Sequence, residues 1–159
     1  MRFTHIALAG AVLAALAAPA LASRGAATGT PTAIHMLGRN LGVTFVDATG
    51  KKKPTTGDYE IAKDALFDRS GARIGTSVVT CTILDVGGTQ FFCNGTNQLK
   101  AGDIVLAGRF SLLSKSYRLA IVGGTGEYAG ARGWEHGTWL DAKYTKLRII
   151  DTFDLASGA

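Results

Sequence analysis

The sequence predicts an all-β domain, built as an antiparallel barrel or a sandwich, and three observations lead to this prediction. Short runs of β-type composition follow one another along the chain and are separated by turn signals. Apolar and polar side chains often alternate within a run, so that Tyr117, Leu119 and Ile121 share one face. An amphipathic period of 3.6 residues persists nowhere for three turns. The short connections favour antiparallel neighbours.

Nine runs are predicted as strands, and several place a polar residue on an apolar face. In order along the chain they are 32–37, 41–47, 58–64, 73–84, 89–99, 103–110, 116–122, 132–140 and 145–155. Asp47 shares a face with Val43 and Phe45, and Asp151 shares one with Leu147 and other apolar residues. Burying an unpaired carboxylate is costly and raises its pKa. Each of these two acids therefore faces a functional interior or lies at the wet end of its strand.

The two cysteines are placed symmetrically about a turn. A chain reversal centred on Gly87 pairs Cys81 with Cys93 and Ile83 with Phe91, all on one face. Directly opposed residues of an antiparallel pair lie about 4.5 to 5.5 Å apart at Cα, within reach of a disulfide. The alternatives are a reactive thiol or a metal ligand, but two cysteines without a nearby histidine pair make a poor zinc site. We predict a cross-strand disulfide and no metal site.

The N-terminal segment MRFTHIALAGAVLAALAAPALAS predicts export. It has an early arginine, an apolar stretch too short to span a membrane and a small-residue pattern ending at Ala22. Residues 1–22 are therefore predicted to be a signal peptide, residues 23–30 a flexible leader, and residues 31–159 a single barrel or sandwich domain. This predicts an extracellular or periplasmic protein in an oxidising compartment. No second apolar segment approaches membrane-spanning length.

The charge of the chain gives no sign of a nucleic-acid partner. The full sequence has a formal net charge of +5. Without Arg2, which lies in the predicted signal peptide, it holds 16 basic and 12 acidic residues. The only basic run is Lys51 to Lys53, and such a run is usually a solvated loop. No aromatic residues are interleaved with it, as they are in nucleic-acid patches. We therefore expect no nucleic-acid partner.

The segment IVGGTGEYAGARG resembles a phosphate-binding loop in its spacing alone. Gly124, Gly126 and Ala129 have the spacing of a dinucleotide fingerprint, which requires a following helix to supply amides to the phosphate. The residues that follow, ARGWEHGTWL, have the composition of a turn leading into a strand. The segment is therefore predicted to be a glycine turn, with no nucleotide cofactor.

Four blocks of the chain resemble the barrel family shared by allene oxide cyclases and dirigent proteins. They are GDYEIAKDALFDRSGARIGT, GDIVLAGRF, YRLAIVGGTGEYAGARG and KLRIIDTFDL, and the resemblance covers roughly residues 40 to 155. It implies a closed antiparallel eight-stranded β-barrel that tends to form homotrimers. It also implies that a hydrophobic or aromatic small molecule binds in the barrel and is guided through cyclisation or coupling without a cofactor. By this resemblance Gly123, Gly124 and Gly126 form a turn at the barrel rim.

The same resemblance supplies candidate catalytic residues. Dirigent proteins use an acid just after GGTG and the arginine of ARG, which correspond here to Glu127 and Arg132. Such a pair could polarise a ligand in a pocket of low dielectric, or form only a rim salt bridge. Asp47 falls where the cyclases hold a bound water, and Phe45 falls where they have a glutamate. Cys81 matches a cyclase pocket cysteine, and a disulfide would remove its thiol.

Candidate ligand-binding residues are aromatic. Phe45, Tyr128 and Trp134 could line an apolar pocket or only pack a core. His136 shares a face with Trp134, and a lone histidine among aromatics is more often a hydrogen-bonded core or rim group than a catalyst. The alternative to a cyclase or coupling guide is a non-catalytic, lipocalin-like binding barrel. A catalyst needs a polar pair inside the barrel, whereas a carrier needs only an apolar cavity.

Overall fold

The computed structural model describes residues 32–51 and 53–155. The predicted signal peptide (1–22) and leader (23–30) lie outside the described residues, as do residues 31 and 156–159 of the predicted domain. Within the described part of the chain, no helix is long and apolar enough to cross a membrane.

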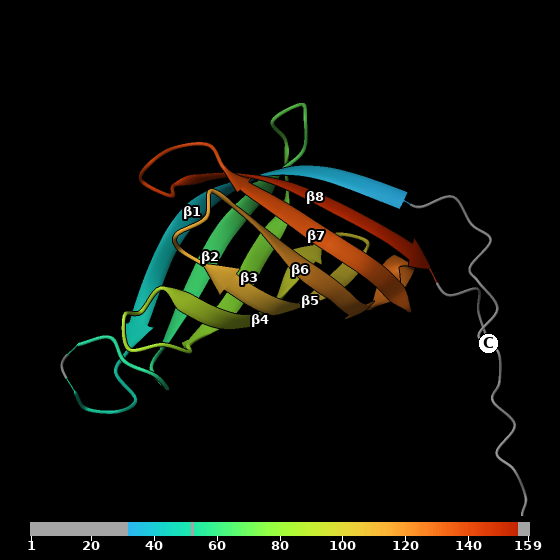
Figure 1. The fold of residues 1–159 in the computed structure, drawn as a ribbon. Coiled ribbons are helices and arrows are strands. Elements are labelled where there is room, and N and C mark those ends of the chain that lie inside the picture. Colours follow the sequence, from blue (N-terminus) through green and yellow to red (C-terminus); the bar gives the residue numbers. More distant parts are fainter. Residues whose placement is uncertain (1–31, 52, 156–159) are drawn as a thin grey trace, which may run out of the picture.

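Eight antiparallel strands form a closed barrel (Figure 1). The strands are β1 (Thr32–Val46), β2 (Tyr59–Phe67), β3 (Arg73–Ile83), β4 (Gln90–Leu99), β5 (Gly102–Ser111), β6 (Ser116–Gly124), β7 (Ala131–Trp139) and β8 (Lys146–Leu155). Each strand pairs with its neighbours in sequence, and β1 pairs with β8 to close the sheet. The barrel confirms the predicted fold class and excludes the sandwich.

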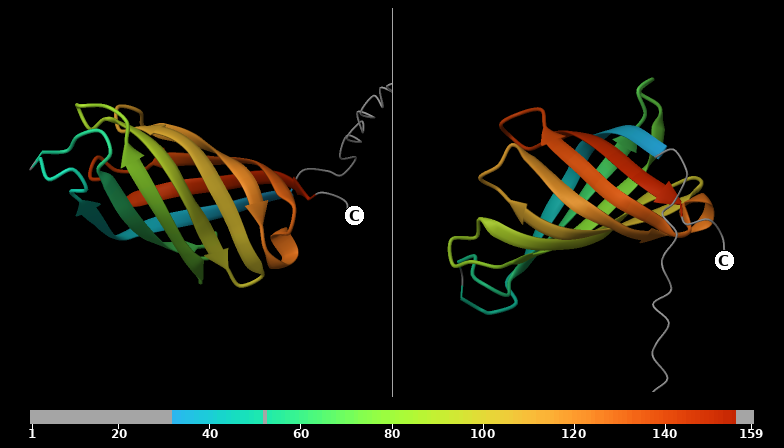
Figure 2. Two further views of the ribbon diagram at one scale, coloured as in Figure 1. Left: turned by 90° about the horizontal axis from the view of Figure 1, so that it is seen from below. Right: turned by 45° about the vertical axis from the view of Figure 1, so that its right-hand side comes forward.

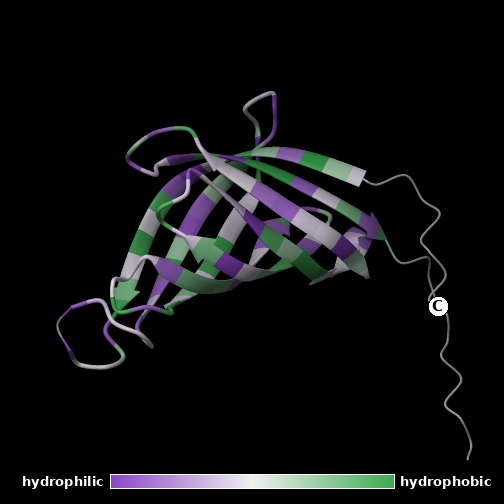
Figure 3. Ribbon diagram, viewed as in Figure 1, coloured by the Kyte–Doolittle hydropathy of each residue, from purple (hydrophilic) through white to green (hydrophobic). Residues whose placement is uncertain are grey.

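One predicted break between strands is absent. The runs 32–37 and 41–47 were expected as two strands because GRN lies between them, but both belong to β1. Gly38 and Arg39 pair with β2 on one side and β8 on the other, so the chain stays extended there. A register shift between Asn40 and Gly42 takes up the irregularity as a bulge. The alternation of apolar and polar residues along the strands is visible in Figure 3.

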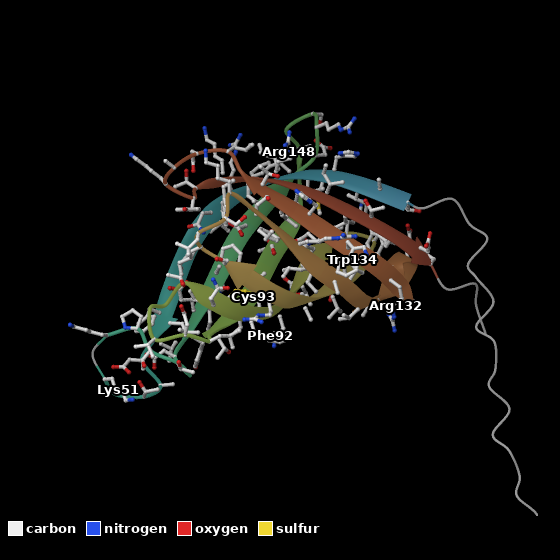
Figure 4. The ribbon with its side chains drawn as sticks, viewed as in Figure 1. Lys51, Phe92, Cys93, Arg132, Trp134 and Arg148 are labelled. Atoms are coloured by element: carbon white, nitrogen blue, oxygen red, sulfur yellow. A yellow bond between two sulfur atoms is a disulfide. The ribbon has the colours of Figure 1, made fainter. Side chains whose placement is uncertain are left out.

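The barrel has two unlike ends. The loop end carries the connections 47–58, 84–89, 112–115 and 140–145, which gather at one end in the left view of Figure 2. The η1 end carries the 3-10 helix η1 (Gly126–Tyr128) and the outer ends of β1 and β8. Figure 4 shows Lys51 at the loop end and Arg132 at the η1 end.

Apolar side chains fill the barrel toward the η1 end. Ile104, Leu106, Ile121 and Phe153 are almost completely buried in one cluster. Tyr128 covers this cluster and makes an edge-to-face contact with Phe153, with ring centroids 5.8 Å apart. The η1 end is thus a packed core, and the space for a ligand lies elsewhere.

The predicted disulfide is present between β3 and β4. Cys81 is directly opposite Cys93, and Ile83 is opposite Phe91, as the reversal about Gly87 predicts. The two cysteine Cα atoms are 4.0 Å apart.

We expect this disulfide to protect both thiols and to stabilise the barrel. The denatured protein should take up iodoacetamide at Cys81 and Cys93 only after reduction, as read by intact mass spectrometry. Replacing both cysteines with alanine should lower the free energy of unfolding by about 3 kcal/mol, because the closed loop is short. Alkylation at both positions without reductant would show that the bond does not form in the isolated protein.

The glycine segment forms a turn between β6 and β7. Gly126 has φ +56°, and a Cβ there would overlap the carbonyl oxygen of Ala101. A Cβ on Gly124 would overlap the carbonyl oxygen of Tyr128. Gly123 is less constrained, since its Cβ would make only an ordinary contact with Arg132, at 3.6 Å. The three-residue helix η1 does not provide the long helix that the dinucleotide fingerprint requires.

Candidate functional site

A cavity of about 180 Å³ occupies the barrel interior toward the loop end. It reaches the loops, because Leu112 and Tyr144 from two of them contribute to its lining. Its side chains come from all eight strands and include Asn40, Val43, Glu60, Ala62, Asp64, Ser77, Val79, Cys81, Phe91, Cys93, Phe110, Tyr117, Leu119, Trp139, Leu147 and Ile149.

The cavity has a polar wall and an aromatic wall. The polar wall is made by β1 to β3, which contribute Asn40, Glu60, Asp64 and Ser77. The aromatic wall is made by β4 to β7, which contribute Phe91, Phe110, Tyr117 and Trp139. In a closed ring of eight strands β2 lies opposite β6, so the carboxyl groups of β2 face the phenol of Tyr117 across the cavity.

Two carboxyl groups of the polar wall are withdrawn from water, Asp64 almost fully and Glu60 in part. Glu60 and Asp64 point inward because they alternate with outward residues on β2. Asp64 is 8% exposed, and its Oδ1 accepts a hydrogen bond from Asn40 Nδ2 at 3.4 Å. Burial raises the pKa of both carboxyls, and the bond from Asn40 opposes this rise only in part at Asp64. Asp64 is therefore easier to protonate than a surface carboxyl.

Tyr117 links the cavity to a polar cluster deeper in the barrel. Its hydroxyl group donates a hydrogen bond to Glu135 Oε1 at 2.9 Å. A Cβ on Gly137, two residues along β7, would overlap the Tyr117 ring, so a glycine there leaves room for the phenol. Burial first, then the charge and hydrogen bond of Glu135, raise the pKa of the Tyr117 phenol well above its usual value. Tyr117 is therefore held as a neutral phenol.

The deeper cluster joins two carboxyl groups and an amide. Glu135 and Asp151 are directly opposed on β7 and β8, and both are almost completely buried. Asn97 Nδ2 donates to Glu135 Oε2 at 2.7 Å and to Asp151 Oδ2 at 3.2 Å. The oxygens Asn97 Oδ1 and Asp151 Oδ1 are buried without a partner among the described residues. The cluster lies one layer below Tyr117, toward the η1 end.

The two carboxyl groups of this cluster share one proton at neutral pH. Burial, then the charge of Glu135 and a hydrogen bond to it, raise the pKa of Asp151 to about 9. Burial also raises the pKa of Glu135, although Asn97, Tyr117 and Asp151 all hydrogen-bond to its carboxylate. The pair therefore keeps a proton to a higher pH than two surface carboxyls would.

The arrangement can deliver and accept protons inside an apolar cavity. Tyr117 lines the cavity and donates its hydroxyl proton to Glu135, which interacts with Asp151, so the phenol oxygen offers a hydrogen-bond acceptor to the cavity. Asp64 offers a proton-transferring group on the opposite wall. Charges act strongly on a ligand in such surroundings because little water screens them. The site is thus suited to general acid and base chemistry.

The pair predicted from the glycine motif lies at the other end of the barrel. Glu127 belongs to η1 and is exposed. Arg132 Nη1 donates a hydrogen bond to the carbonyl oxygen of Ala131 at 2.7 Å. Neither residue lines the cavity, and their catalytic role remains a prediction that the geometry does not favour.

The predicted ligand-binding aromatics are also dispersed. Trp134 is 48% exposed and stacks on Arg118, whose guanidinium carbon is 4.0 Å from the ring centroid. It lies on the outer face because its neighbour Glu135 points inward, and His136 lies outside for the same reason. Tyr128 packs at the η1 end.

Two predicted residues do lie at the loop end. Phe45 is 41% exposed and is paired with Glu60, so it shares the inward side of the sheet near the cavity entrance. Asp47 follows β1, and its Oδ1 accepts a hydrogen bond from the backbone amide of Gly50 at 2.6 Å. Neither contributes to the cavity lining.

The sequence prediction missed the polar residues that the barrel brings together. Asp64, Tyr117 and Glu135 come from three strands, and no local motif joins them. A signal was nevertheless present in β7, where Glu135 alternates with Gly133 and Gly137 as the one charged residue on a small-residue face. Asp151 was singled out as an acid on an apolar face, and the structure places it inside.

Comparisons with known structures place this fold among barrels of diverse activity. A pyocyanin demethylase is 25% identical, with a TM-score of 0.65 over 76% of this chain and 99% of the other. A pterocarpan synthase dirigent protein is 16% identical, with a TM-score of 0.65 over 81% of this chain and 97% of the other. The Diels-Alderase AbmU from Streptomyces koyangensis is 17% identical, with a TM-score of 0.64 over 79% of this chain and 64% of the other. The last two likenesses establish the fold.

The family comparison is decisive. No curated protein sequence matches this chain significantly. The model of the allene oxide cyclase barrel-like domain matches residues 41–149, which include every cavity-lining residue except Asn40 and most of the polar cluster. Together with the closed eight-stranded barrel, this match shows that the chain belongs to the allene oxide cyclase barrel-like family.

Proposed function

We propose that this protein binds a hydrophobic or aromatic small molecule in its barrel cavity and steers either its cyclisation, by proton transfer, or its coupling, by holding a molecule that is already activated in one orientation. In this proposal Asp64 and Tyr117 are the groups that act on the ligand. The protein would do so after export, where the oxidising compartment permits the bond between Cys81 and Cys93. Assembly as a homotrimer remains a prediction from the resemblance.

The observation that carries this proposal is a polar pair inside an apolar cavity. A carrier needs only apolar walls, yet Asp64 and Tyr117 face each other across this one. Burying such groups costs free energy of folding, and this cost is typical of sites selected for chemistry. Burial raises the pKa of Asp64, which makes this carboxyl a better proton donor to a bound ligand than a surface acid would be.

The two walls have separate roles. The aromatic wall would hold the body of the ligand by stacking and edge contacts, as Phe110 and Tyr117 already do with each other at 5.7 Å between centroids. The polar wall would receive a hydrogen-bond donor of the ligand or a positive charge that develops during the reaction. The Glu135 hydrogen bond would fix the Tyr117 hydroxyl in one orientation.

The comparisons support this class of ligand and reaction. The neighbour at 25% identity is a demethylase named for pyocyanin, a small aromatic compound. Other neighbours are named for pterocarpan synthesis and for Diels-Alder reactions, which build rings. These activities belong to those proteins, and they support a ring-forming role for this chain only in combination with its own cavity.

We expect Asp64→Asn to keep the fold and lower turnover at least about 100-fold, since a general acid or base contributes a factor of this order or more. Tyr117→Phe should lower turnover less, because it removes a hydroxyl and leaves the ring. The measurement is liquid chromatography with mass spectrometry of a metabolite extract from the producing cells, incubated with wild type or variant. Wild type should convert one compound to an isomer or coupled product.

Glu127→Gln and Arg132→Leu are matched controls, because they remove the polar pair at the η1 end. Their turnover should equal that of the wild type. If these two variants lose turnover while Asp64→Asn does not, the reaction takes place at the η1 end and the proposal is wrong. If wild type retains a compound through gel filtration but never alters it, the protein is a binding barrel.

A further inference from the structure

The loop end of the barrel exposes large apolar side chains where polar residues are usual. Twelve such side chains are exposed in the described part of the chain, and five of them lie in the connections at this end: Leu84, Val86, Leu113, Leu140 and Tyr144. Val86 and Leu113, in two hairpin loops, are 82% and 79% exposed. Hairpin loops normally carry Gly, Asn, Asp or Ser for reasons of backbone geometry. The turns themselves therefore do not explain these two side chains.

The exposed side chains surround the entrance to the cavity. We call them the apolar rim, defined by Phe45 near the end of β1 and by Val86, Leu113 and Leu140 from three of the connections at the loop end. The cavity opens among these segments, because its lining includes Leu112, next to Leu113, and the loop residue Tyr144. The rim thus lies at the end of the barrel into which the cavity opens.

The rim is flanked by lysines. Lys51, Lys53, Lys115 and Lys143 are exposed in the loops of this end, and Figure 4 shows Lys51 on the β1–β2 connection. The carboxylates of two of these loops are turned toward their own backbone. Asp85 accepts a hydrogen bond from the amide of Thr89 at 2.8 Å, and Asp141 accepts one from the amide of Thr145 at 2.8 Å. Asp47 and Asp58, the other two described acids of these loops, likewise accept hydrogen bonds from backbone amides. The four lysines and four aspartates balance in number, and it is the aspartates that are turned toward the backbone.

We infer that the apolar rim and its lysines dock the barrel on an anionic lipid surface, with the cavity entrance facing the bilayer. Single apolar side chains on separate loops can each enter the headgroup region, while neighbouring ammonium groups contact lipid phosphates. A protein partner would instead be expected to cover a continuous, closely packed patch. An apolar ligand dissolved in the bilayer would then reach the cavity without crossing water.

The test is sedimentation with vesicles of phosphatidylcholine alone or with about 30% phosphatidylglycerol. Wild type should bind the anionic vesicles more strongly than vesicles of phosphatidylcholine alone. This difference should shrink at high salt, because salt screens the lysine charges. Val86→Ser combined with Leu113→Ser should lower the partition coefficient at least about tenfold, and Lys51→Glu combined with Lys143→Glu should remove the preference for anionic vesicles. Val122→Ser is the matched control, because Val122 is 42% exposed on β6, away from the loop end.

Wild type and variants all begin at Ser23, as predicted after export, so that the apolar segment 1–22 cannot itself bind the vesicles. Circular dichroism melts establish that each variant is folded. The inference is overturned if wild type ignores anionic vesicles, or if Val122→Ser weakens binding as much as the rim variant. It is also overturned if sedimentation velocity shows that the rim variant dissociates an oligomer, since the rim is then a protein interface. Turnover of a water-soluble substrate by the rim variant should be normal, which separates this result from a failure of the proposed reaction.

Discussion

At about pH 8, Asp151→Asn is expected to unfold at a higher denaturant concentration than the wild type, whereas near pH 4 the two proteins should be equally stable. Burial, then the charge of Glu135, raise the pKa of Asp151 to about 9 in the folded protein, while its ordinary value is 3.8. Between these two values the folded protein keeps the proton and the unfolded chain has released it. Stability therefore falls as pH rises, by up to about 1.4 kcal/mol per pH unit.

The stabilising effect of the protonated carboxyl is fully present below pH 3.8 and is lost as pH rises through about 9. Asparagine has nearly the same shape, donates a hydrogen bond to Glu135 in place of the carboxyl proton and does not titrate. Urea unfolding of both proteins at several pH values measures the difference, in which titrating groups outside the Glu135–Asp151 pair cancel. Asp103→Asn on the outer side of β5 serves as a control. A constant difference between wild type and Asp151→Asn across this range would mean that Asp151 is ionised in the folded barrel.

Gly126→Ala is expected to lower the free energy of unfolding by about 2 to 5 kcal/mol. The left-handed conformation at φ +56° costs a residue with a Cβ roughly 1 to 2 kcal/mol, and overlap with the carbonyl oxygen of Ala101 adds about 1 to 3 kcal/mol. Gly71→Ala isolates the first effect. Gly71 also has a positive φ, +85°, but has no atom within 4 Å of the position of a Cβ.

Chemical denaturation of the two variants decides between the causes. Gly71→Ala should lose only about 1 to 2 kcal/mol, and the excess loss in Gly126→Ala then measures the close approach of the glycine turn to the β4–β5 connection. Equal losses in both variants would show that backbone conformation alone requires glycine at position 126.

Calorimetry should detect no saturable binding of NAD to the wild type, because η1 has only three residues.

The fold was predictable because it depends on local patterns. Alternation along each strand fixes which side chains face inward, and the symmetric placement of Cys81 and Cys93 about Gly87 predicts the β3–β4 register directly. The break predicted within β1 failed because a bulge can absorb GRN without ending the strand. A glycine and a polar residue in sequence do not distinguish a bulge from a turn.

The candidate site was less predictable because it depends on how eight strands curve around one another. Asp64 and Tyr117 are 53 residues apart in sequence, and only closure of the barrel sets them on opposite walls. Glu127 and Arg132 are close in sequence and stand in a recognisable motif, so they were chosen in place of residues that have no motif. The motif specifies the turn between β6 and β7, and the turn lies at the η1 end, where the interior is already filled.

Closure between β1 and β8 also determines when the protein becomes safe from aggregation during synthesis. Every other pairing joins consecutive strands, but Arg39 of β1 finds its partner Lys146 only after nearly the whole barrel has been made. Until then the free side of β1 and the free side of the newest strand both present unpaired backbone groups, which are templates for edge-to-edge association. Ribosome stalling or proteolysis ahead of β8 therefore leaves a sheet with two open edges, and such fragments should be cleared or precipitate instead of accumulating as slightly less stable barrels.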